Sequence, residues 1–297
     1  MSKLLDYNPF KAAKLKGKPL VLDGALGSYL QQKGFITDSI VWTTMINQTD
    51  PQAVIRLHQE YLKAGAEIIT TNTFRTNPAS LEHSGISDNL KLVEDAVGLV
   101  KQSVKRKKVF IAGSNPPAED CYQKERTISY AKLELNHCKH IDLLVDSGVN
   151  FILNETQSHF DELHIICEYC SKNEIPHVIS LYVDESLRIL SGESLEAVLK
   201  FLNTQYLLAL GFNCISPNIL NKILRSIKLP DIWGFYLNCG GGKLTDRVIQ
   251  CSVQPVEYIE NVKKAMPYKP SFIGSCCGSN PEHTKKLREF IDGKASS

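Results

Sequence analysis

The stretch "DPQAVIRLHQEYLKAGAEIITTNTF" (Asp50–Phe74) predicts a helix followed by a buried strand. Asp50 is a good N-cap, Pro51 suits the first helical position, and Gly65 can take the left-handed conformation with which many helices end. The following residues, Ala66–Phe74, form a nearly continuous apolar run. Such runs are typical of parallel strands that are covered on both faces. The stretch therefore indicates one repeating unit of an α/β fold.

The same unit recurs along the chain. Helical patterns follow most of the apolar runs, for example over Ser129–Gly148 and Ser279–Gly293. Seven further runs read as strands: Pro19–Gly24, Lys108–Asn115, Val149–Thr156, Pro176–Val183, Tyr206–Ile215, Asp231–Gly240 and Ser271–Gly278. Eight strands alternating with helices in 297 residues predict an α/β fold, a (β/α)8 TIM barrel formed as a single domain over residues 1–297. A doubly wound sheet is the alternative, but "DGALGS" after the first strand lacks the GxGxxG spacing of its phosphate turn.

Composition and charge exclude several classes of partner. The net charge is only +2, and we interpret the densest basic stretch, Lys105–Lys108, as a solvated helix end and not as a nucleic-acid site. No apolar run reaches the roughly 18–20 residues of a membrane span, and the N-terminus lacks the apolar segment of a signal peptide. We expect a cytoplasmic protein that acts on small molecules, with no nucleic-acid or membrane partner.

The nine cysteines do not suggest a disulfide framework, because they are scattered, odd in number and expected in a reducing compartment. Cys167 and Cys170 have the CxxC spacing, but they fall in a stretch with helical periodicity. We interpret them as small core residues of a helix. His283, just after the start of the last helix, is expected at the surface.

Two adjacent thiols, Cys276 and Cys277, stand between Gly274 and Gly278 where the eighth strand stops. Successive strand residues point to opposite faces, so two adjacent thiols can reach one point only beyond the end of a strand. The flanking glycines give the backbone that freedom.

A third thiol comes from another strand end, because functional side chains of such barrels stand at the C-terminal ends of the strands. Cys214 ends the sixth strand, and with the adjacent pair it would make a Zn²⁺ site with an open fourth position. Cys239, at the end of the seventh strand, is a rival third ligand. Simple packing of buried free cysteines is the alternative interpretation.

Several segments resemble the homocysteine S-methyltransferase family: "LDGALGSYLQQKG", "HQEYLKAGAEIITTNTFRTN", "ILNETQS", "GFNC" and "IGSCCGSNPEHTKKL". That family includes enzymes that depend on S-methylmethionine or betaine, and the homocysteine domain of cobalamin-dependent methionine synthase. The resemblance extends from Leu22 to Phe290. It implies a (β/α)8 barrel in which Cys214, Cys276 and Cys277 hold Zn²⁺ and homocysteine binds as a thiolate in the fourth position.

The resemblance also implies a set of substrate-binding residues. Two acids, Asp23 and Glu155, would hold the amino group of homocysteine. Backbone N–H groups of the turn after the first strand, formed by Ala25, Leu26 and Gly27, would take its carboxylate. Two asparagines, Asn213 and Asn238, match positions near the metal.

The methyl donor is less well defined, because "AGSNPPAED" after the third strand and "YLNCGGG" after the seventh depart from the family pattern. We expect S-methylmethionine, with S-adenosylmethionine as the second choice. Trp42, Phe74 and Tyr122 are candidates to contact a sulfonium cation. Betaine, or a methylcobalamin or folate partner, is an alternative donor, and a zinc hydrolase and a non-catalytic zinc-binding barrel are alternative functions.

Overall fold

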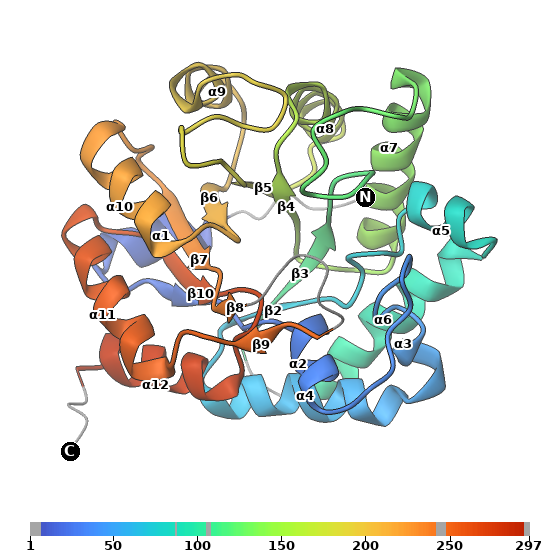
Figure 1. The fold of residues 1–297 in the computed structure, drawn as a ribbon, viewed down its shortest axis with the longest axis horizontal. Coiled ribbons are helices and arrows are strands. Elements are labelled where there is room, and N and C mark those ends of the chain that lie inside the picture. The colour runs from blue at the N-terminus through green and yellow to red at the C-terminus, as the bar shows by residue number, and fades with distance from the viewer. Residues whose placement is uncertain (1–6, 87, 105–107, 242–247, 294–297) are drawn as a thin grey trace.

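Eight parallel strands form the centre of the structure, and helices surround them (Figure 1). The computed structural model describes residues 7–86, 88–104, 108–241 and 248–293. The strands pair in the order β1-β10-β7-β6-β5-β4-β3-β2. Their bounds are β1 Leu20–Val21, β2 Ile68–Thr70, β3 Phe110–Asn115, β4 Phe151–Gln157, β5 His177–Leu181, β6 Ala209–Asn213, β7 Trp233–Leu237 and β10 Phe272–Ser275. The predicted (β/α)8 barrel is confirmed.

The barrel closes between β1 and β2, which stand at the two ends of the strand order. Leu22 and Ile68 form a single parallel bridge. The N–H of Glu67 donates to the carbonyl of Val21 at 2.7 Å, and the N–H of Asp23 donates to the carbonyl of Ile68 at 3.0 Å. Closure pairs the two outer strands of the eight-stranded sheet and brings its strand ends into one ring.

Helix α1 precedes the first strand. The other helices lie around the outside of the barrel, and most of them connect one strand to the next (Figure 1). In α4 the predicted caps are confirmed: the carboxylate of Asp50 accepts from the N–H of Ala53, and Gly65 has a φ of +104°. The helices are α1 Pro9–Leu15, α2 Gly27–Gln32, α3 Ile46–Thr49, α4 Pro51–Ala64, α5 Pro78–Ser84, α6 Asn89–Ser103, α7 Tyr130–Asp146, α8 Phe160–Lys172, α9 Leu195–Leu202, α10 Pro217–Ser226, α11 Pro255–Ala265 and α12 Pro281–Ile291. A short 3-10 helix, Met266–Tyr268, follows α11.

Helix α1 covers the N-terminal end of the barrel. The ring of Phe10 lies edge-on to Phe151 and Phe272, with ring centroids 5.4 and 5.3 Å apart, and these two residues begin β4 and β10. The side-chain amide of Asn8 donates to the carbonyl of Leu208 at 2.8 Å. Phe10 and its aromatic neighbours fill the N-terminal end of the barrel, so polar ligands are expected at the C-terminal end.

Three local predictions have outcomes in the structure. Cys167 and Cys170 are buried core residues of α8, as predicted. The prediction that His283 is a surface residue is wrong: it is 1% exposed, because its Nε2 donates to the carbonyl of Val253 and its Nδ1 completes the cap of α12. The predicted strand Asp231–Gly240 ends earlier, at Leu237, and a short antiparallel pair follows it, β8 Gly240–Gly241 and β9 Gln250–Cys251. Residues 105–107 of the basic stretch lie outside the described residues.

Within the described ranges, no helix combines the length and the apolar character that crossing a membrane requires.

Candidate functional site

Three cysteines meet at the C-terminal end of the barrel. The sulfur atoms of Cys214, Cys276 and Cys277 all lie within 4.8 Å of one another. The sulfur of Cys277 is 3.9 Å from that of Cys214 and 4.0 Å from that of Cys276. Cys214 and Cys276 are joined as a disulfide, with α-carbons 5.7 Å apart. The structure thus brings together the ends of β6 and β10, and we call these three side chains the sulfur cluster.

The sulfur cluster fits a tetrahedral metal. Zn–S bonds of about 2.3 Å place two thiolates of one tetrahedral zinc roughly 3.8 Å apart, and both distances to Cys277 are close to that. The third pair, Cys214 and Cys276, would have to be reduced before both sulfurs could bind a metal. Burial, with the charge of Glu155 adding to it, raises the pKa of the Cys277 thiol to about 11, so this thiol needs a nearby cation to ionise at neutral pH. No fourth protein ligand joins the cluster in the described part of the chain, which leaves a tetrahedral ion one position for a further ligand.

Unusual backbone at the strand ends brings the three sulfurs together. Cys214 follows β6 with a φ of +53°, in the left-handed region. The N–H of Cys276 stays in the ladder and donates to the carbonyl of Leu237 at 2.8 Å. Gly278 then has a φ of +80°, and a Cβ there would lie 2.4 Å from the α-carbon of Gly240. The position after the pair therefore requires glycine.

Cys239, the rival third ligand, lies outside the sulfur cluster. Its side chain is buried, and its sulfur contacts the carbonyl of Leu237 at 3.7 Å. Its N–H donates to the carbonyl of Cys277 at 2.8 Å. The neighbouring Asn238 uses its Oδ1 to accept from the N–H of Gly240 at 2.8 Å, so this side chain shapes the turn into β8.

Asp23 lies at the seam where the barrel closes. Its Oδ2 accepts from the N–H of Thr70 at 2.8 Å and from the Thr70 hydroxyl at 3.1 Å. The side chain is almost fully buried, and burial raises its pKa to about 8 in spite of these hydrogen bonds. The charge of Glu155 raises this pKa further, so the two acids repel each other.

Glu155 comes from β4. Its Oε1 accepts from the Ser114 hydroxyl, and its Oε2 lies 3.5 Å from the Tyr236 hydroxyl. Burial raises its pKa to about 7. Within the described residues, neither Glu155 nor Asp23 has a lysine, arginine or histidine at ion-pair distance. Asp23 is buried and Glu155 is partly buried, and two such acids without a basic partner form a site that a cationic ligand would stabilise.

The turn after β1 is partly occupied. The N–H of Ala25 donates to the hydroxyl of Ser279 at 3.0 Å. The N–H groups of Leu26 and Gly27 have no acceptor within the described residues. A Cβ at Gly27 would lie 2.4 Å from the ring of Trp42, so a larger residue there would displace that ring.

Asn213 is fully buried and is hydrogen-bonded to Thr156 through both its amide nitrogen and its amide oxygen. The sequence predicted Asn213 as a residue near the metal, and it did not single out Thr70, Ser114 or Tyr236. Their one signal was position, because each stands at or next to the C-terminal end of its strand: Thr70 in β2, Ser114 in β3 and Tyr236 in β7.

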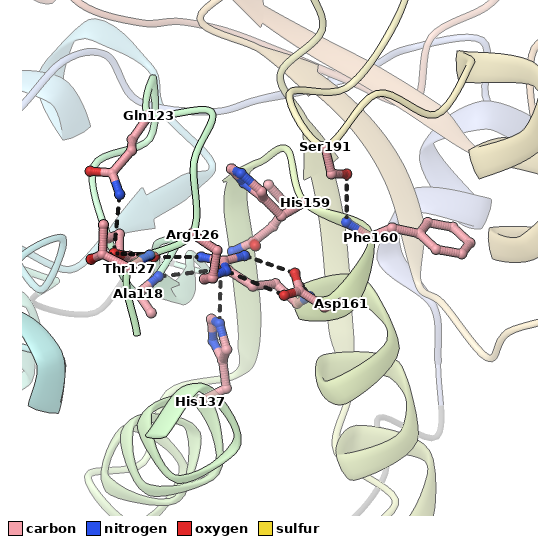
Figure 2. Close-up of polar contacts among 12 residues, drawn as sticks. Ala118, Gln123, Arg126, Thr127, His137, His159, Phe160, Asp161 and Ser191 are labelled. Carbon is pink, nitrogen blue, oxygen red and sulfur yellow. Dashed lines mark hydrogen bonds and ion pairs between the residues drawn. The ribbon is translucent and has the colours of Figure 1, made fainter. Parts of the chain in front are cut away.

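Figure 2 shows the polar contacts of Arg126, which lies in the loop between β3 and α7. Its guanidinium pairs with Glu162 at 2.7 Å, with Asp161 at 2.7 Å and with Glu119 at 3.1 Å. The fully buried Glu162 also contacts Nε2 of His137 at 2.9 Å. This charge network ties the loop to the start of α8.

The anchored loop carries Tyr122, one of the candidate donor contacts. The Tyr122 ring lies edge-on to Tyr182, which follows β5, with centroids 5.2 Å apart. The other two candidates, Trp42 and Phe74, form a second edge-to-face pair at 6.1 Å. Two of the three candidates therefore pair with each other, and Tyr122 pairs with a tyrosine that was not a candidate.

The family model described as "Homocysteine S-methyltransferase" matches residues 20–291. The chain belongs to the homocysteine S-methyltransferase family. The resemblance found in the sequence is confirmed. The match covers every barrel strand from β1 to β10 and the whole of α12.

Curated relatives match over nearly their full length. The chain is 22% identical to homocysteine S-methyltransferase 2 of Arabidopsis thaliana over 324 residues, which cover 95% of this chain and 96% of the relative. It is 22% identical to homocysteine S-methyltransferase of Escherichia coli K12, covering 95% and 98%. A selenocysteine Se-methyltransferase of Brassica oleracea is 19% identical, covering 98% and 94%.

Solved structures show the same fold. The metallated form of the Escherichia coli homocysteine methyltransferase MmuM aligns with a TM-score of 0.77 at 22% identity, covering 94% of this chain and 99% of that one. Its oxidized form aligns with a TM-score of 0.81 at 21% identity, covering 96% and 100%.

The Arg126 network generates a prediction about pH. Burial alone would raise the pKa of Glu162, but the hydrogen bond from His137 and the charges of His137 and Arg126 hold it below its usual 4.5. A lowered pKa stabilises the fold fully above the usual value, and this stabilisation disappears as the pH falls through the lowered one. Glu162→Gln should therefore cost about 3 kcal/mol of unfolding free energy at pH 7, and the difference from wild type should shrink below about pH 4.5.

Urea unfolding at pH 7 and at pH 4 measures both values. Glu168→Gln is the matched control, because Glu168 is exposed on the same helix and should change little. A difference that grows as the pH falls, or no difference at pH 7, would contradict this description of the network.

Proposed function

We propose that the chain transfers a methyl group from a sulfonium donor, S-methylmethionine or S-adenosylmethionine, to the thiolate of homocysteine, and that Cys214, Cys276 and Cys277 hold Zn²⁺ for this reaction. The observation that carries the proposal is the position of the sulfur cluster near two acids, Asp23 and Glu155, that have no basic partner in the described residues. A metal at the sulfur cluster would bind a thiol, and the two acids would bind an ammonium group. An amino acid with a thiol side chain carries both groups. Zinc would supply the positive charge that keeps the substrate sulfur deprotonated at neutral pH.

The transfer needs no acid catalyst. The homocysteine sulfur attacks the methyl carbon of the sulfonium, and a new C–S bond forms. The bond between that carbon and the donor sulfur breaks, and its electron pair stays on the donor sulfur. The donor leaves as a neutral thioether, and homocysteine becomes methionine. Catalysis then comes from positioning and electrostatics.

In this proposal the chain's own groups orient the substrate. Asp23 and Glu155 bind its ammonium group, and the N–H groups of Leu26 and Gly27 are free to take its carboxylate. The N–H of Ala25 would have to exchange its bond to Ser279 to join them. The aromatic pairs containing Tyr122 and Trp42 supply ring faces that suit a sulfonium cation.

A hydrolase on this barrel has less support. Zinc hydrolases usually use histidine and carboxylate ligands, whereas the cluster in the described residues consists of three cysteines. Hydrolysis also gives no role to two acids that can hold an ammonium group. A non-catalytic zinc site would normally have four protein ligands, and the cluster offers three.

The direct test is methionine formation from homocysteine labelled with carbon-13, which separates new methionine from methionine left behind by the donor. We expect the reduced, zinc-loaded protein to produce labelled methionine with S-methylmethionine, and more slowly with S-adenosylmethionine. Betaine should give none. Product only with betaine would contradict the donor assignment, and no product with any donor would contradict the function.

The ligand assignment can be tested with two matched serine variants. Cys214→Ser should lose both zinc and activity, because Cys214 belongs to the sulfur cluster. Cys239→Ser should keep about one zinc per chain and most activity, because the Cys239 thiol contacts a carbonyl outside the cluster. Metal analysis after gel filtration measures both, and the reverse pattern would show that Cys239 is the ligand.

The two acids predict a pH dependence of amino-acid binding. An acid with a raised pKa is neutral below that pKa and ionises as the pH rises, so affinity for an ammonium group should increase between pH 6 and pH 8 as groups with pKa values of about 7 and about 8 ionise. L-Methionine is the suitable probe, because it has no thiol that titrates. Glu155→Gln should weaken methionine binding about tenfold at pH 8 and flatten the rise.

Isothermal calorimetry measures these affinities. Glu185→Gln is the control, because Glu185 is an exposed acid in the loop after β5 and should leave binding unchanged. A methionine affinity that is independent of pH and equal in Glu155→Gln would exclude Glu155 as an ammonium ligand.

A further inference from the structure

Two strand ends at the site have left-handed backbone at residues other than glycine. Thr156 has a φ of +59° and Cys214 has a φ of +53°. A β-branched residue such as threonine rarely adopts this conformation. Such conformations persist where surrounding contacts hold them, and they are concentrated at functional sites.

A single side chain joins these two strand ends. The Oδ1 of Asn213 accepts from the N–H of Thr156 at 2.9 Å, and its Nδ2 donates to the Thr156 hydroxyl at 2.8 Å. Both residues are almost completely buried. Asn213 belongs to β6 and Thr156 to β4, and β5 lies between these strands, so the two hydrogen bonds bridge the end of β5.

The pairing of β4 with β5 explains why Thr156 needs this partner. Asn154 pairs with Ile179 and Gln157 pairs with Leu181, so β4 has one residue more than β5 across this interval. The extra residue makes a bulge, which leaves an N–H without a ladder partner and re-aims the side chains near it. Asn213 accepts from the N–H of Thr156 at this bulge.

The bridge connects the two parts of the candidate site. Thr156 directly follows Glu155, the acid from β4, and Asn213 directly precedes Cys214, the β6 member of the sulfur cluster. The bridge therefore ties the backbone that carries the Glu155 carboxylate to the backbone that carries the Cys214 sulfur. We propose that Asn213 and Thr156 are positioning residues that set the separation between Glu155 and Cys214 and thereby select an amino-acid thiol of the length of homocysteine. This inference rests on the proposed function, in which Glu155 takes the amino group and Cys214 helps to hold the metal.

If the distance between the amino-group site and the metal is fixed, only a substrate with a matching distance between its nitrogen and its sulfur can bind at both. Cysteine is shorter than homocysteine by one methylene group, and one methylene changes enzyme selectivity by about 10–200-fold. The two bridging residues are the chain neighbours of the two groups that would bind the ends of the substrate. Loss of the bridge should therefore change selectivity as well as rate.

The test compares Thr156→Val with Thr156→Ser. Valine has the shape of threonine and the same β-branching, so it removes the hydroxyl and leaves the amide nitrogen of Asn213 without its partner. Serine keeps the hydroxyl. Asn213→Ala removes both hydrogen bonds. Three quantities are measured: kcat/KM for homocysteine, the preference for homocysteine over cysteine, and the zinc retained in competition with a chelator.

We expect kcat/KM for homocysteine to fall about tenfold in Thr156→Val, as for the loss of one buried hydrogen bond. Its preference for homocysteine over cysteine should fall at least about fivefold, and it should release zinc at a lower chelator concentration. Thr156→Ser should stay within about twofold of wild type in all three quantities. Asn213→Ala should show the effects of Thr156→Val or larger ones.

Two results would overturn the proposal. Thr156→Val could match Thr156→Ser in selectivity and zinc retention, which would give the hydrogen bonds only a structural role. Alternatively, Asn213→Ala alone could be impaired, which would mean that Asn213 contacts the substrate directly. If the wild type forms no methionine, the proposed function fails, and zinc retention in the valine and serine variants still decides whether the bridge positions Cys214.

Discussion

The backbone contact between β1 and β2 closes the barrel, and the candidate site depends on that closure because it places distant strand ends in one ring. The two strands are short and meet at the bridge between Leu22 and Ile68. Immediately beyond the bridge, the carboxylate of Asp23 accepts the N–H of Thr70, where a further ladder bond would otherwise be needed. Asp23, the acid proposed to bind substrate, is thus also part of the closure, and its hydrogen bond to Thr70 holds its carboxyl group in place.

Electrostatics explains why such a site should bind cations. Three cysteine sulfurs and two carboxyl groups share the C-terminal end of the barrel, and within the described residues no basic side chain pairs with either carboxyl group. Burial raises the pKa values of Asp23, Glu155 and Cys277, so the unliganded site favours their neutral forms. A metal ion, an ammonium group and a sulfonium each bring the positive charge that the protein itself does not provide there. Arg126 has a different role, because its charge is paired with the fully buried Glu162 and with two more exposed acids that anchor a loop.

The sequence predicted the parts of the fold that depend on local pattern. Apolar runs marked all eight barrel strands, and the family motifs selected Cys214 over Cys239, which the structure finds outside the cluster. The sequence could not predict the bulge in β4, because nothing in the identity of Thr156 reveals a positive φ that long-range contacts impose. It also missed the burial of His283, since the carbonyl that His283 binds belongs to Val253, 30 positions earlier. The partners of Glu155 were missed for the same reason, because Ser114 and Tyr236 lie on other strands.

The central claim is that three cysteine sulfurs hold zinc and leave one position for the substrate sulfur. X-ray absorption at the zinc edge tests it most directly, because it counts sulfur neighbours at a Zn–S distance of about 2.3 Å. The reduced, zinc-loaded protein should show three sulfur ligands and one lighter atom, and addition of homocysteine should replace the lighter atom with a fourth sulfur. Four sulfurs before homocysteine is added, or a count of three that homocysteine does not change, would contradict the account.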